Sequence, residues 1–165
     1  MQAAIDDFTR IVFIGLGATA LMDAWLWLLG RLGIPTMNFA LLGRWVGHVA
    51  RGGWSHQAIG KAPAIPRENA LGWLTHYAVG IAFAGLLVAA CGLQWTRQPT
   101  WPPALAFGLA TVLVPLLVVQ PAMGLGFASS KTSTPARNTA RSVANHAVFG
   151  AGLYVAASAV QRIAG

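Results

Sequence analysis

The sequence predicts an all-α integral membrane protein with four transmembrane helices. Of its 165 residues, 56% are hydrophobic and only 9% are charged, whereas a soluble domain carries about 25% charged residues. Four apolar segments are each long enough to cross about 30 Å of hydrocarbon, which takes roughly 20 helical residues. These segments lack the alternation of polar and apolar residues that outer-membrane barrel strands show. We therefore expect a single transmembrane domain over residues 1–165.

The four predicted membrane helices cover residues 9–29, 70–94, 102–120 and 139–163. Gly30 is a stop signal for the first helix, and Thr100 before Trp101 is a start signal for the third. Pro115 should kink the third helix, because proline removes one backbone hydrogen bond and clashes with the carbonyl four residues earlier.

Residues 38–51, in the first long loop, are predicted to form a short interfacial helix. Asn38 is suited to cap its start, and Arg44, His48 and Arg51 recur on one face at helical spacing. We expect this helix to lie on the cytoplasmic leaflet, where Arg44 and Arg51 would contact lipid headgroups. The alternative is a lid over a site between the helices.

Lysine and arginine residues are unevenly distributed between the two sides of the predicted bundle. The two long loops carry five and three of them, and the opposite side carries three. Because cytoplasmic loops are enriched in these residues, we expect both long loops in the cytoplasm and both termini on the opposite side of the membrane. The net charge of +7 then faces membrane lipids, and no basic patch typical of nucleic-acid binding is present.

A weak internal repeat relates the two helical hairpins. Residues 15–19 (Gly-Leu-Gly-Ala-Thr) resemble 108–111 (Gly-Leu-Ala-Thr), and residues 74–80 (Leu-Thr-His-Tyr-Ala-Val-Gly) resemble 144–150 (Ala-Asn-His-Ala-Val-Phe-Gly). Because each hairpin contains two helices, both hairpins enter the membrane in the same sense. Duplication would therefore relate them by a pseudo-twofold axis along the membrane normal.

Three ionisable residues are expected to meet inside the bundle. Asp23, His76 and His146 lie on rows of small residues at every fourth position, and such rows let helices approach closely in lipid. At 1.5 Å per residue, each lies about 10 Å below the predicted cytoplasmic boundary. A carboxylate at a helix centre costs about 2.5 to 3.5 kcal/mol, so Asp23 needs a partner, for which the histidines are the candidates.

Neutral imidazoles and a carboxylate are ligands that suit a transition metal, and two related histidines could also hold haem axially. The candidate metal ligands are Asp23, His76, His146, His48 and His56. Gln120, at the end of the third helix, joins Asp23, His76 and His146 as a candidate for ligand binding or proton relay. A hydrogen-bonded pair that only pins the helices is the structural alternative.

The sequence therefore favours a membrane protein that binds a transition metal or haem and acts as an accessory subunit of a membrane complex. One alternative is a proton-coupled small-solute transporter, which would act as a homodimer because four helices enclose little space. The others are an enzyme acting on a lipid or quinone and a purely structural subunit. Enzymatic activity is the less favoured class, because no nucleophile motif is present.

Five motifs extend over most of the chain. They are Gly-Ala-Thr-Ala-Leu-Met-Asp at 17–23, Gly-Arg-Trp-Val-Gly-His at 43–48, Gly-Trp-Leu-Thr-His-Tyr at 72–77, Gln-Pro-Ala-Met-Gly-Leu-Gly at 120–126 and His-Ala-Val-Phe-Gly-Ala-Gly-Leu-Tyr at 146–154. By these motifs the chain resembles the bacterial membrane family catalogued as domain of unknown function 2938. The resemblance implies a multi-spanning bacterial membrane protein and supplies no activity. With the charge count, it predicts a protein of the bacterial inner membrane with both termini in the periplasm.

Overall fold

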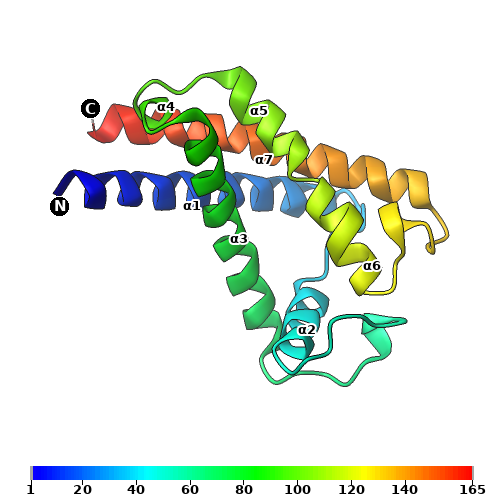
Figure 1. The fold of residues 1–165 in the computed structure, drawn as a ribbon. Coiled ribbons are helices and arrows are strands. Elements are labelled where there is room, and N and C mark those ends of the chain that lie inside the picture. The colour runs from blue at the N-terminus through cyan, green and yellow to red at the C-terminus, as the bar shows by residue number, and fades with distance from the viewer. Residues whose placement is uncertain (1, 165) are drawn as a thin grey trace. The chain divides into compact units, whose positions relative to one another are not determined.

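The computed structural model describes residues 2–164, and every regular element among them is helical (Figure 1). Within these residues, four helical segments are long and apolar enough to cross a membrane: Ile5–Arg31, Glu68–Cys91, Trp101–Ala122 and Pro135–Ile163. The prediction of an all-α, multi-pass membrane protein is thus confirmed.

The observed helix ends differ from the predicted ones by up to seven residues, the largest difference being at α1, which spans Gln2–Arg31 and not 9–29. Helix α3 spans Glu68–Cys91 and stops earlier than predicted, because Gly92 adopts φ +82° and a left-handed glycine ends a helix. Helix α7 spans Pro135–Ala164 and starts earlier than predicted. Its first turn is polar, and Pro135 supplies the fixed φ that suits a first helical residue.

The third membrane segment is interrupted in its middle. Helix α5 spans Trp101–Ala110, a π-helical segment η2 spans Pro115–Val119, and helix α6 spans Gln120–Ala122. A hydrogen-bonded turn at residues 111–112 separates α5 from the rest. The kink predicted at Pro115 is therefore present as a turn followed by a π-helix, a form of helix that is frequent at functional sites.

The chain divides into two compact units. Unit 1 contains Met1–Ile34, Tyr77–Thr111 and Asn145–Gly165, and unit 2 contains Pro35–His76 and Val112–Ala144. The unit boundary passes through α3, the third membrane segment and α7. The single transmembrane domain stays a prediction.

In unit 1, α1 (Gln2–Arg31) and α7 run antiparallel and side by side (Figure 1). Small residues bring them together: a Cβ built on Gly17 would lie 2.8 Å from Ala156 Cβ, and one on Gly152 would lie 2.9 Å from Ala18 Cα. Such close backbone packing stabilises helix pairs in lipid, where burial of apolar surface alone gives no preference for helix association.

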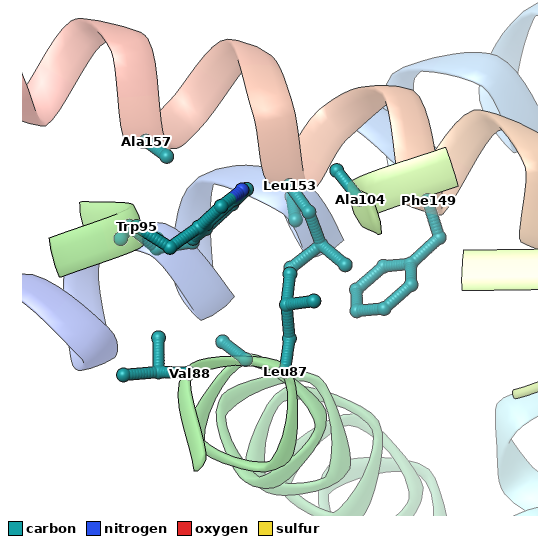
Figure 2. Close-up of a cluster of buried hydrophobic side chains, with 10 residues drawn as sticks. Leu87, Val88, Trp95, Ala104, Phe149, Leu153 and Ala157 are labelled. Carbon is teal, nitrogen blue, oxygen red and sulfur yellow. The ribbon is translucent and has the colours of Figure 1, made fainter. Parts of the chain in front are cut away.

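The core of unit 1 joins α1, α3, α5 and α7. Figure 2 shows Leu87 of α3 pointing toward Leu153 and Phe149 of α7. Trp95, from the short helix α4 (Gln94–Arg97), closes one end of this cluster. The buried residues of the cluster are Ile14, Ala18, Ala84, Leu87, Val88, Trp95, Ala104, Phe149, Leu153 and Ala157.

In unit 2, the predicted short helix in the first loop is present as α2, spanning Phe39–Val49. As predicted, Asn38 caps its start: the Asn38 side chain accepts a hydrogen bond of 3.0 Å from the backbone N–H of Ala40. Helix α2 packs on the first turns of α3, because Gly43 and Gly72 carry no side chains. A Cβ on either glycine would overlap the backbone of the facing helix.

Candidate functional site

Asp23 and Tyr77 form a hydrogen-bonded pair inside unit 1. The hydroxyl of Tyr77, on α3, bonds to the side chain of Asp23, on α1. Both residues lie one turn away from the point where α1 and α3 cross, at which Gly80 packs directly against Thr19. Tyr77 is therefore a partner of the membrane carboxylate, and sequence reasoning did not assign this residue to the site.

His146 pairs with Thr111, whose side chain is 5% exposed. The Thr111 Oγ1 atom lies 2.8 Å from Nδ1 of His146 and 2.6 Å from the carbonyl oxygen of Gly108. A hydroxyl has one proton to donate, and the Gly108 carbonyl can only accept. If Thr111 donates to Gly108, His146 donates from Nδ1, and Nε2 becomes the basic nitrogen of the neutral ring.

A third hydrogen bond fixes the relative level of these two pairs. Trp25 Nε1 donates to Asn145 Oδ1 at 3.0 Å and links α1 to α7. Asp23 precedes Trp25 by two residues and His146 follows Asn145 by one, and in antiparallel helices both steps lead the same way, by about 3 Å and about 1.5 Å. Asp23 and His146 therefore lie at nearly the same level of unit 1.

His76 belongs to unit 2 and packs among aromatic rings. Its ring centre lies 4.7 Å from that of Phe39 and 6.0 Å from that of Trp73. The idea that His76 shares one pocket with Asp23 and His146 stays a prediction.

Gln120 organises the third loop within unit 2. Ser129 Oγ donates to Gln120 Oε1 at 3.0 Å, and Gln120 Nε2 donates to Ser142 Oγ at 3.5 Å. Ser129 and Ala128 both have positive φ, 61° and 48°, a conformation that residues with a side chain adopt rarely. Gln120 thus holds a strained loop, and its assignment to a ligand site stays a prediction.

Arg44 is engaged by unit 2 itself. Its guanidinium forms two hydrogen bonds with Glu68, of 2.9 and 2.7 Å, and two more with loop carbonyls, those of Gly60 and Ala62. The side-chain hydrogen bonding that Arg44 donates to Glu68 is the main cause that raises the pKa of Arg44. Arg51 is exposed. Headgroup contacts of Arg44 and Arg51 stay predictions, and most donors of Arg44 are already used.

His48 and His56 lie together in unit 2, with ring centres 4.9 Å apart. In the part of the chain that the structure describes, no three His, Cys, Asp or Glu side chains are grouped as ligands of one metal ion. The structure therefore pairs Asp23 with Tyr77 and His146 with Thr111, two partners that were not predicted. It also places the predicted residues His48 and His56 side by side.

Residues 12–160 match the model of a family described as "Protein of unknown function (DUF2938)". No curated protein and no solved structure matches the chain. The match covers most of all four membrane segments and the loops between them.

Proposed function

Since the chain belongs to the family described as protein of unknown function (DUF2938), from which no activity can be carried over, we propose a function from the pairs in unit 1. The proposed function is proton-coupled transport of a small solute across the bacterial inner membrane. Asp23 and His146 would take up and release the proton.

One observation carries this proposal: each titratable group is paired with a hydroxyl, and the two pairs lie at one level. A hydroxyl donates and accepts. Tyr77 can therefore donate to the ionised carboxylate of Asp23 and accept from its protonated form. Asp23 can therefore keep its hydrogen bond to Tyr77 in both protonation states. This matters because a buried polar group without a hydrogen bond is costly inside the membrane.

The same reasoning applies to His146. If its Nδ1–H donates to Thr111, a proton can join or leave Nε2 without breaking that bond. A pair that served only to pin two helices would need no such tolerance to a change of charge. Ionisable residues within membrane helices commonly form proton relays, and this tolerance is what a relay requires.

The interruption of the third membrane segment supports a transport mechanism in which this segment changes conformation. Thr111 caps the end of α5 and is the first residue of the turn that precedes η2. Helices with π-helical turns and broken helices are frequent at functional sites and in transporters. Metal or haem binding by Asp23, His76 and His146 has less support, since no group of three such ligands occurs among the described residues.

We further propose that the two hairpins are an internal repeat. Gly15 of α1 packs against α3, and a Cβ added to Gly15 would lie 2.5 Å from Ile81 Cα. Gly108 of α5 packs against α7, and a Cβ added to Gly108 would lie 2.9 Å from the carbonyl oxygen of His146. Residues 15–19 thus contact residues 74–80 in the first hairpin, and residues 108–111 contact residues 144–150 in the second. We also propose that the long loops are cytoplasmic, that α2 lies at the lipid surface and that two copies of the chain form the transporter.

Proton exchange can be measured directly on the purified protein in lipid nanodiscs. A pH jump followed with an indicator dye should show one proton fewer exchanged per chain in Asp23→Asn than in the wild type. Asp7→Asn is the matched control, because Asp7 lies on the same helix but pairs with Arg97 at 2.9 Å near the end of the segment. Equal proton exchange in the wild type and Asp23→Asn would reject the relay.

Transport itself can be tested in vesicles that contain a pH-sensitive dye. Amino acids, monocarboxylic acids and divalent metal ions are added singly, and a transporter should show solute-dependent proton entry in the wild type. Asp23→Asn should abolish this entry, and Asp7→Asn should retain it. Proton exchange without solute-dependent entry for any member of the panel would contradict the transport part of the proposal.

A further inference from the structure

The histidine pair of the first loop is held in place from both sides. His48 lies in the last turn of α2. The backbone N–H of His56 donates to the carbonyl oxygen of Ala122 at 2.8 Å, and Gly124 packs so closely on the His56 and Gln57 carbonyls that it has no room for a side chain. The rings, 4.9 Å apart with planes at 64°, are therefore attached to a well-packed backbone.

One nitrogen of this pair is an exception to the usual rule for buried polar atoms. Within the described residues, Nδ1 of His56 is buried and has no hydrogen-bond partner. The great majority of buried polar side-chain atoms have a partner, and one that lacks it often marks an ion or a water molecule. The surroundings of His56 therefore indicate a bound species at Nδ1.

The second ring is oriented as a metal ligand would be. Nε2 of His48 lies 2.9 Å from the carbonyl oxygen of Pro63. A carbonyl only accepts, so Nε2 carries the proton and Nδ1 of the neutral ring has the lone pair. Histidines that bind metals usually donate their other N–H to a carboxylate, a carbonyl or water in this way.

The spacing of the rings also fits one shared ion. With metal–nitrogen bonds of about 2.0 to 2.1 Å, a metal lies about 3.2 Å from each ring centre, so two imidazoles on one tetrahedral ion have centres about 5 Å apart. The observed 4.9 Å agrees with this value. We propose that His48 and His56 bind one divalent transition metal ion, such as Cu²⁺ or Zn²⁺, through imidazole nitrogen.

The neighbouring charges permit such a site. Arg44, one turn before His48, is neutralised by Glu68 at 2.7 Å. His48 and His56 are both partly exposed as whole residues, so water can fill the remaining coordination positions. With two protein ligands, the site should bind Cu²⁺ more tightly than Zn²⁺, following the general order of divalent ions. The proposal is independent of the proton relay, which uses residues of unit 1.

Electron paramagnetic resonance of Cu²⁺ added to wild-type protein in detergent tests the site without any substitution. We expect magnetic coupling of the copper to the nitrogens of two imidazoles. Coupling to one imidazole or to none would overturn the proposal.

Calorimetric titration with Zn²⁺ then identifies the ligands. His48→Gln and His56→Gln should each weaken binding at least about 10-fold. Changing a residue that only hydrogen-bonds to a metal ligand already costs about that much, and loss of the ligand itself should cost no less. The control Gln57→Ala changes an exposed neighbour of His56 and should bind like the wild type, and circular dichroism must show intact helices in every variant. Unchanged affinity in folded His48→Gln and His56→Gln, or equal weakening in Gln57→Ala, would overturn the proposal.

Discussion

Thr111 Oγ1 lies within hydrogen-bonding distance of two groups, Nδ1 of His146 at 2.8 Å and the Gly108 carbonyl oxygen at 2.6 Å. The second contact lies within α5 itself. Threonine hydroxyls in helices often donate to a carbonyl oxygen of the preceding turn in this way. The first contact links α5 to α7. Because both contacts involve one hydroxyl, the orientation of the His146 ring depends on the local geometry of the helix break.

Thr111→Val should therefore change both stability and proton exchange. Valine has the shape of threonine but cannot bond to His146, and the loss of a buried hydrogen bond costs about 1 to 3 kcal/mol. Unfolding in mixed detergent micelles measures the stability, and the pH-jump assay measures the exchange. Thr111→Ser keeps the hydroxyl and should restore proton exchange. Wild-type exchange in Thr111→Val would show that this hydroxyl has no role in the relay.

The glycines at the helix crossings should be intolerant of even one added methyl group. A Cβ on Gly15 would lie 2.5 Å from Ile81 Cα, a backbone atom that cannot move without the helix. Gly15→Ala should therefore destabilise unit 1 by about 1 to 3 kcal/mol. Gly85→Ala is the control: its Cβ would meet Ile11 Cγ2 at 3.7 Å, so it should be neutral or stabilise by up to about 1 kcal/mol. Equal unfolding of the two variants would contradict the crossing geometry.

The membrane segments and the capped helix α2 could be predicted because they depend on properties read along the chain. Length and hydropathy determine which segments can span a bilayer, and an Asn side chain can cap a helix wherever the next residues are helical. The start of α7 was predicted four residues late, at Thr139 in place of Pro135, because hydropathy gives no weight to a polar first turn. The Pro135 signal was present in the sequence.

The partners of the ionisable residues could not be predicted in the same way. The depth estimate placed Asp23 level with His76, but a helix rotates by about 100° per residue, so His76 and Tyr77 have equal depth and different directions. The structure gives the Asp23 contact to Tyr77 and places His76 beside Phe39. Rotation of each helix about its axis depends on packing between helices, which one sequence does not reveal.

Arg44→Lys should loosen the first loop of unit 2. Arginine can form a fork with Glu68 while it also bonds to the carbonyls of Gly60 and Ala62, and a lysine lacks this planar fork. We expect faster trypsin cleavage after Lys61, which lies between the two carbonyls. Arg51→Lys changes an exposed residue and should leave the cleavage rate unaltered. Equal rates in both variants would mean that Arg44 does not hold this loop.

The long loops should lie on the cytoplasmic side of the inner membrane. These loops and the adjoining helix ends carry eight of the eleven basic residues, and each Lys or Arg near an anionic leaflet contributes about 1 kcal/mol of attraction. Cys91 is exposed, so Cys91→Ser provides a background for single cysteines at Lys131, in the third loop, and at Gln98, in the second. A maleimide that cannot cross the membrane should label Gln98→Cys in intact spheroplasts and label Lys131→Cys only after the membrane is opened. The reverse pattern would place the basic loops outside, and the positive charge would then have to serve a partner other than the cytoplasmic leaflet.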